Sequence, residues 1–132
     1  MSISTIATAA AEFIENVWNA TDGIARLSEW LTVDYKDHAY ANDREGLARA
    51  IAELRAAFPN ARFVIEDIVV DETNAALRLK LVGEQTGAFR GRPARGAAIE
   101  IAVFRWLRFE GRRIAEHWAL LDTTSLLKQL DA

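Results

Sequence analysis

The stretch AIEIAVFRWLRFEGRRIAEHWALLD, residues 98–122, decides the fold of this chain. Its two halves, 98–109 and 113–121, are rich in aliphatic and aromatic residues, and residues 110–112 between them, Glu-Gly-Arg, are typical of a turn. We therefore expect two neighbouring antiparallel strands at this point of the chain.

Both faces of the first of these strands are apolar. Alternation places on one side Ile99, Ile101, Val103 and Leu107, and on the other side Phe104 and Trp106. A single layer of helices can bury only one of these faces. Because the other face would expose a large hydrophobic patch to water, we expect it to form the interface of a homodimer.

Upstream of this stretch, residues 62–72 and 75–85 read as two more strands, joined at the turn-forming cluster 71–74. Three helices are expected before them, at about 4–19, at 24–31 and at 43–58, because apolar residues recur there at three- and four-residue steps. Asp43 stands where the third helix needs an N-cap, and Pro59 ends its pattern. Residues 33–40 read as a short strand or loop, 87–96 as a glycine-rich loop and 123–130 as a short closing helix.

This order of elements predicts an α+β fold, with three N-terminal helices packed on one face of a mostly antiparallel sheet and a short C-terminal helix. A length of 132 residues suits a single domain that spans residues 1–132.

Composition narrows the classes of function. Hydrophobic residues make up 51% of the chain, and the net charge of −3 is spread without an acidic or basic half, which gives no support for binding nucleic acid or a membrane surface. There is no cysteine, which excludes disulfides and thiolate chemistry. No apolar run approaches the ~20 residues of a spanning helix. We expect a cytoplasmic protein whose partner is a small-molecule ligand or substrate.

Five segments together resemble the SnoaL-like polyketide cyclase family, within the larger superfamily of proteins similar to nuclear transport factor 2 and ketosteroid isomerase. They are DYKDH at 34–38, EGLARAIAELRAAFPN at 45–60, GEQTGAFRGRPARG at 83–96, RFEGRRIAEHWALLD at 108–122 and LLKQL at 126–130. The resemblance implies a curved sheet that forms a conical pocket with the helices, and an aspartate near the end of the last strand that acts as acid and base. That aspartate matches Asp122. The family is expected to use neither a metal nor an organic cofactor.

Strand geometry suggests which side chains accompany Asp122. If the turn pairs Phe109 with Ile114 and the strands run on without interruption, Arg105 lies opposite Trp118. We then expect a single cavity to be lined by Arg105, Glu116, Trp118 and Asp122, with His117 facing away from it. An apolar cavity would raise the pKa of Asp122 toward neutrality, whereas the charge of Arg105 would oppose that shift.

The remaining candidates each have a structural alternative. Asp122 could cap the closing helix, since Thr123-Thr124-Ser125 follows it. His38, which matches the histidine of the family's D-Y-x-x-H stretch, is a second catalytic candidate or a hydrogen-bonded structural residue. Pocket-lining roles are expected for Trp18, Trp30, Tyr35 and Gln85, of which the tryptophans could equally be core. No pair of residues has the spacing of a metal site.

Two functions from different classes remain open. The first is a cofactor-independent enzyme that acts on a small hydrophobic carbonyl compound by proton transfer, in an aldol cyclisation or an isomerisation, with Asp122 as acid and base. The second is a non-catalytic protein of the same fold that binds an apolar or anionic ligand against Arg105. Hydrolysis of an epoxide ranks below both. It requires a water-activating set of two aspartates and an arginine, and Asp122 and Arg105 supply only part of it.

Overall fold

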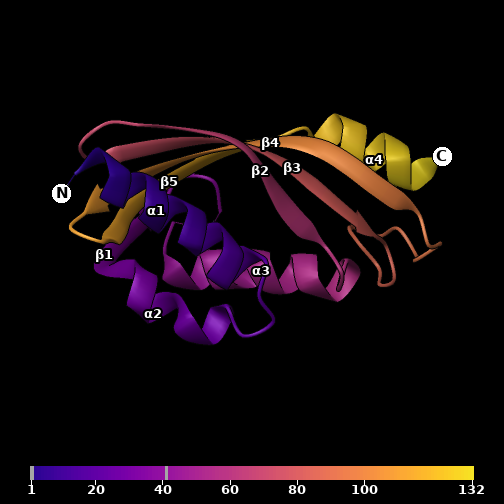
Figure 1. The fold of residues 1–132 in the computed structure, drawn as a ribbon. Helices are drawn as coiled ribbons and strands as arrows, with labels where there is room; N and C mark the ends of the chain where they lie inside the picture. The colour runs from indigo at the N-terminus through magenta and orange to yellow at the C-terminus, as the bar shows by residue number, and fades with distance from the viewer. Residues whose placement is uncertain (1, 41) are drawn as a thin grey trace.

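The computed structural model describes residues 2–40 and 42–132 and has helices below a curved sheet (Figure 1). The helical elements are α1 (Ile3–Phe13), the π-helical turn η1 (Ile14–Trp18), the 3-10 turn η2 (Ile24–Arg26), α2 (Leu27–Trp30), α3 (Arg44–Ala57) and α4 (Thr123–Asp131). The strands are β1 (Leu31–Asp37), β2 (Arg62–Val70), β3 (Asn74–Glu84), β4 (Ala98–Glu110) and β5 (Arg113–Leu121). The predicted α+β fold is confirmed.

The helices begin at side-chain caps. Ser2 accepts a hydrogen bond from the amide of Thr5 at the start of α1, and the predicted cap Asp43 accepts one from the amide of Gly46 at 2.8 Å. The first predicted helix differs in its second half, because the chain widens into η1 from Ile14 onward. This π turn brings the buried Trp18 to the middle of the sheet's inner face, where its ring meets that of Phe63.

The sheet has the strand order β1-β5-β4-β3-β2. Only β1 and β5 run parallel, and the other neighbours are antiparallel. The order brings the end of β1, residues far upstream in the sequence, beside the middle of β5, with Asp37 opposite His117. This parallel pair is what assembles the site described below.

A β-bulge interrupts the pairing of β4 with β5. Phe109 pairs with Ile114 as expected, but Arg108 then pairs with Glu116, so Ala115 is an extra residue on β5. From that point Arg105 lies opposite Ala119 and Trp106 opposite Trp118. The uninterrupted register that we expected is therefore wrong by one residue, and one residue of slip exchanges the two faces of a strand.

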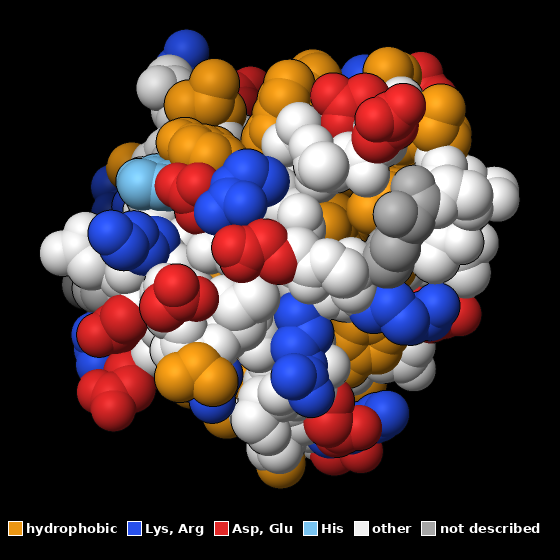
Figure 2. All heavy atoms as spheres, turned by 90° about the vertical axis from the view of Figure 1, so that its left-hand side faces the viewer, with side chains coloured by type: hydrophobic (Ala, Val, Ile, Leu, Met, Phe, Trp, Pro, Cys, Tyr) orange, Lys and Arg blue, Asp and Glu red, His pale blue; other side chains and the backbone are white. Residues whose placement is uncertain are grey.

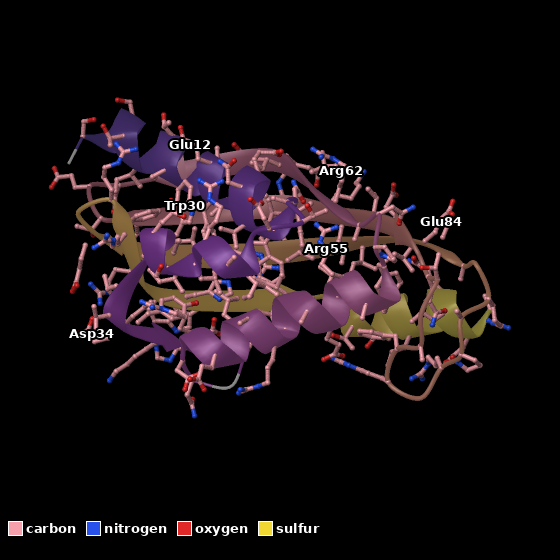
Figure 3. The ribbon with its side chains drawn as sticks, turned by 90° about the horizontal axis from the view of Figure 1, so that it is seen from below. Glu12, Trp30, Asp34, Arg55, Arg62 and Glu84 are labelled. Carbon is pink, nitrogen blue, oxygen red and sulfur yellow. The ribbon has the colours of Figure 1, made fainter. Side chains whose placement is uncertain are left out.

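The core lies between the helices and the inner face of the sheet. The helices cross this face when it is seen from below, with Trp30 and Arg55 labelled between α1 and α3 (Figure 3). Arg55 on α3 donates hydrogen bonds to the carbonyl oxygens of Trp18, Pro59 and Ala61, which ties the helical layer to the start of β2. The outer face of β4 stays open, as its alternation predicts, and exposes Phe104 and Trp106. On β5, Trp118 and Leu120 are exposed on the same face, contrary to the expected inward direction of Trp118.

Candidate active site

A cavity of about 90 Å³ lies between the helical layer and the inner face of the sheet. Its wall is mostly apolar and aromatic, and the residues that line it include Trp18, Tyr40, Leu54, Phe58, Phe63 and Leu81. Arg105 is the buried charged residue in this wall. The exposed ion pair of Arg90 with Glu53, at 3.8 Å, also belongs to the lining and marks the side that faces solvent.

Arg105 points inward from β4 and is 2% exposed. Its guanidinium carbon lies 3.9 Å from the ring centre of Trp18 and 4.8 Å from that of Phe63, both of which attract the cation. Its Nη1 lies 3.2 Å from Nε2 of His117 and 3.4 Å from the hydroxyl of Tyr40. Its Nε and Nη2 are buried and have no hydrogen-bond partner within residues 2–40 and 42–132. Buried donors without a hydrogen-bond partner are uncommon in protein interiors.

His117 connects Arg105 to a buried carboxylate. Its Nδ1 lies 3.0 Å from Oδ2 of Asp37, and that oxygen also accepts a 2.6 Å hydrogen bond from the hydroxyl of Tyr35. The other oxygen of Asp37 accepts the amides of Ala39 and Tyr40, at 2.9 and 2.6 Å. Because the carboxylate accepts at Nδ1, the imidazole proton stands there and Nε2 presents its lone pair to Arg105.

The surroundings of Asp37, His117 and Arg105 keep these three side chains in one protonation state near neutral pH. Burial lowers the pKa of His117, and the charge of Arg105 lowers it further against the opposing effect of Asp37. Burial alone would raise the pKa of Asp37, but hydrogen bonds from His117, Tyr35 and the Tyr40 amide hold it below its ordinary value. Burial and the nearby Asp37 carboxylate raise the pKa of Tyr35. The set is therefore a carboxylate, a neutral imidazole and a guanidinium.

Asp122 does not line this cavity, and the predicted position inside an apolar hollow is wrong. The residue is exposed and caps α4, where Oδ1 accepts the amide of Ser125 at 3.1 Å and Oδ2 accepts its hydroxyl at 2.6 Å. Hydrogen bonds from the Ser125 side chain and amide lower the pKa of Asp122. An exposed carboxylate with a lowered pKa is a weak base near pH 7, so the capping alternative fits the geometry.

His38, Glu116 and Trp118 lie on the outer side of the sheet, contrary to the expectation that Glu116 and Trp118 share the cavity of Arg105. His38 Nε2 lies 2.7 Å from Oε2 of Glu116, and its ring stacks on Trp118 with centres 4.6 Å apart. Glu116 also accepts a hydrogen bond from Nε of Arg108 at 2.7 Å. His38 and Trp118 border a groove of about 670 Å³ on the open face. His117, which was expected to face away, is the histidine of the inner site.

The other expected pocket residues are distributed between the cavity and the core. Trp18 lines the cavity, whereas Tyr35 lies behind it as the hydrogen-bond donor to Asp37. Trp30 packs in the helical layer with its ring 6.2 Å from that of Phe13. Gln85 is fully buried outside the lining, and its Nε2 donates to the carbonyl of Arg92 at 3.0 Å, which holds the 87–96 loop. Gln85 and Trp30 thus have structural positions.

Three residues of the site, Asp37, Tyr40 and His117, were missed by sequence reasoning. Asp37 and His117 stand in segments that were already singled out, at 34–38 and 108–122. The alternation of β1 held a usable signal, because Tyr35 and Asp37 must share one face of a strand. No comparable signal reveals the bulge at Ala115, which decides the side of His117.

Within residues 2–40 and 42–132, neither a metal-binding cluster nor a membrane-spanning helix is found. The residues that the structure describes contain no group of three or more histidine and acidic side chains that could hold a metal ion. Within the same ranges, every helix is too short or too polar to cross a membrane. At the end of the molecule that carries the β4–β5 turn, acidic and basic side chains alternate without a continuous field of one sign (Figure 2).

Known structures share this architecture over nearly the whole chain. IdmH from Streptomyces antibioticus, a proposed polyketide cyclase, is 26% identical, with a TM-score of 0.85 over 96% of this chain and 98% of IdmH. AclR from Streptomyces galilaeus, a proposed hydroxylase, is 21% identical, with a TM-score of 0.89 over 98% of both chains. A SnoaL-like polyketide cyclase from Agrobacterium tumefaciens is 20% identical, with a TM-score of 0.80 over 98% of this chain and 99% of the other.

No curated protein matches the chain in sequence. The family model of the SnoaL-like polyketide cyclases matches residues 8–130, which includes every residue of the inner site. The segments that suggested the resemblance lie within this range, and the fold agrees with it. The chain belongs to the SnoaL-like polyketide cyclase family.

Proposed function

We propose that this protein is a cofactor-independent enzyme that moves a proton on a small carbonyl compound held in the inner cavity, as in an aldol cyclisation or an isomerisation. The observation that carries the proposal is the buried guanidinium of Arg105, whose Nε and Nη2 have no partner in the described part of the chain and which belongs to a mostly apolar wall. Membership of the cyclase family supports the reaction class.

Loss of a proton from the carbon beside a carbonyl group leaves negative charge on the carbonyl oxygen. A fixed cation with free N–H donors stabilises that charge most where water is excluded. Arg105 meets this requirement, because Trp18 covers it and its Nε and Nη2 have no partner in the described part of the chain. We assign Arg105 the role of binding the carbonyl oxygen and stabilising the enolate.

His117 contacts Arg105 but does not itself line the cavity, and we assign it the role of the base. Its lowered pKa keeps the imidazole neutral near pH 7, and Asp37 keeps the proton on Nδ1, so Nε2 can accept one. When Nε2 takes the proton from carbon, Asp37 stabilises the imidazolium that forms, and the proton then returns to carbon or oxygen. The arrangement requires the substrate to displace Nη1 of Arg105 from its 3.2 Å contact with Nε2.

The cavity sets a limit on the substrate. A volume of about 90 Å³ holds roughly three water molecules at ~30 Å³ each, well below the ~300–1,000 Å³ typical of sites for larger ligands. A compound larger than a few carbon atoms needs the loop at Phe89 and Arg90 to move away from α3. Small ketones are therefore the appropriate first substrates.

Exchange of solvent deuterium into the α-carbon of 2-butanone, followed by NMR, tests the proposal without knowledge of the natural substrate. The protein should accelerate exchange over buffer, and His117→Gln should abolish the acceleration. His38→Gln is the matched control, because His38 lies on the outer face and should leave the rate unchanged. Equal rates for wild type and His117→Gln, with both proteins folded by circular dichroism, would exclude His117 as the base.

A non-catalytic binding protein is the second candidate. The observation in its favour is that Nη1 of Arg105 already occupies the lone pair of His117, which makes the imidazole a structural link rather than a free base. In that case ligands bind at Arg105 but no deuterium exchange exceeds that of buffer.

We also propose that the open face joins two copies of the chain. In support, Leu120 is 77% exposed and Phe104 is 51% exposed, beside Trp106 and Trp118 on the same face. Burial of these side chains against a second copy would remove a large apolar area from water. Sedimentation should give a dimer for the wild type and a monomer for Leu120→Glu. A monomeric wild type at tens of micromolar would refute this proposal.

A further inference from the structure

The two unpartnered donors of Arg105 share one edge of the guanidinium plane. In an arginine side chain the N–H of Nε and one N–H of Nη2 point in parallel, and Nη1 lies on the far side. Nη1 is the nitrogen that faces His117 and Tyr40. The part of the group without a partner is therefore the complete edge that can make two parallel hydrogen bonds. Both nitrogens are covered by neighbouring side chains, so a ligand reaches them only when those side chains shift.

We infer that the ligand of the inner cavity carries a carboxylate, which Arg105 holds side-on through Nε and Nη2. The inference rests on the proposed function in one respect, the location of the ligand in this cavity. Two oxygens on one carbon match the spacing of the Nε and Nη2 donors, and the opposite charges strengthen both bonds. A ketone or an amide offers only one oxygen to this edge, so it would leave the match incomplete.

The acidic groups nearby do not compete for Arg105. Both oxygens of Asp37 are occupied, since they accept from Tyr35, His117 and two backbone amides. Glu53, the carboxylate of the cavity lining, pairs with Arg90 at the exposed side. The Nε and Nη2 edge of Arg105 therefore remains available for an acceptor on the ligand. A carboxylate has the charge and the shape that match this edge.

The rest of the cavity indicates what the carboxylate is attached to. Around Arg105 the wall is formed by Trp18, Phe63, Leu81 and other apolar side chains. A volume of about 90 Å³ leaves room for a few carbon atoms beyond the carboxylate. The class of ligand is thus a short aliphatic acid or keto acid, bound with its charged end toward β4 and its apolar part toward α3.

Calorimetric titration with butyrate and with butyramide tests this inference, since the two differ in charge and in one acceptor oxygen. Butyrate should bind at least about tenfold more tightly, the effect expected when charge-assisted hydrogen bonds are lost. Arg105→Lys keeps the charge but loses the paired donors, so it should weaken butyrate binding by about tenfold or more. Arg112→Gln is the control, because Arg112 is exposed and lies outside the cavity lining, so its replacement should leave the affinity within about threefold.

A measurement on the wild type covers the case in which Arg105→Lys does not fold. Butyrate should shift the ¹H–¹⁵N resonance of the Arg105 Nε group downfield, and butyramide should shift it much less. The inference is overturned if butyramide binds as tightly as butyrate, if neither binds, or if a folded Arg105→Lys protein binds butyrate as tightly as the wild type.

The same compounds separate this inference from the proposed function. If the protein catalyses deuterium exchange into 2-butanone at least as well as into 2-oxobutyrate, the proposed enzyme activity stands and the inference of a carboxylate ligand is refuted. If butyrate binds at Arg105 but the protein catalyses no exchange into either ketone, the carboxylate site stands and the proposed enzyme activity is refuted.

Discussion

Replacement of Asp37 by asparagine removes the acceptor that joins β1 to β5 inside the core. In the native protein Oδ1 accepts two backbone amides, and Oδ2 accepts the Tyr35 hydroxyl and Nδ1 of His117. Asparagine can keep its oxygen toward the amides, but its amide group then turns donors toward Tyr35 and His117. Flipping the His117 tautomer does not relieve this, because the proton would move to Nε2 and face Arg105.

The cost of this change can be worked from the number of bonds lost. Two hydrogen bonds to a charged acceptor are worth roughly 1.5–3 kcal/mol each, and removal of one partner from a buried charged set costs about 3–5 kcal/mol. We expect Asp37→Asn to lower the free energy of unfolding by about 3–5 kcal/mol. In a chain of 132 residues this corresponds to a fall in Tm of about 10–20 °C.

Urea unfolding followed by tryptophan fluorescence measures this loss, with an unchanged m value as the sign that both states are comparable. Asp34→Asn is the matched control, because Asp34 is on the same strand but exposed, and its substitution should cost less than about 0.5 kcal/mol. A loss below about 1 kcal/mol for Asp37→Asn would refute the view that this carboxylate holds the cluster together.

Three further predictions follow from the same geometry. The pKa of His117 is lower in the folded state than in the unfolded chain, so the unfolded chain binds more protons below about pH 6.5. The free energy of unfolding of the wild type, measured by urea titration, should therefore decrease as the pH drops below that value. His117→Gln should remove this decrease, and His38→Gln should not. The folded-state pKa of Asp37 is also lowered, so its contribution should be complete above about pH 4 and disappear below that, which a comparison of wild type with Asp37→Asn from pH 2 to 6 measures. Deletion of Ala115 should remove the bulge and leave Arg108 opposite Glu116 and Leu107 opposite His117. His117 should then stay on the inner face, and thermal unfolding should remain cooperative; loss of the cooperative transition would contradict this reading of the bulge.

Most of the architecture could be predicted from local sequence patterns. The stripe that includes Leu47 and Ile51 identifies α3, and the alternation along β4 correctly separates its inner face from its outer face. Such patterns act over a few residues, so they need no knowledge of the partner strand. The inward direction of Arg105 was also predicted, but from a pairing opposite Trp118 that was wrong by one residue; its place between Val103 and Leu107 agrees with the inner face.

The members of the site beyond Arg105 depended on contacts between distant segments. Sequence spacing could not indicate that the end of β1 pairs with β5, which brings Asp37 to His117 across 80 positions of the chain. Asp122 followed the family pattern, but local hydrogen bonds to Ser125 provide its partners at the helix terminus.

The sequence by itself determined the family, the α+β layers and the apolar face of β4 that carries Arg105, because these follow from hydrophobic periodicity and turn residues. Tertiary structure alone decided which histidine enters the core. A single extra residue, Ala115, turns His117 inward and Trp118 outward, and the energy that fixes it is the packing and hydrogen bonding of β5 between β1 and β4. These interactions form between neighbouring strands, so the sequence of β5 alone does not predict them.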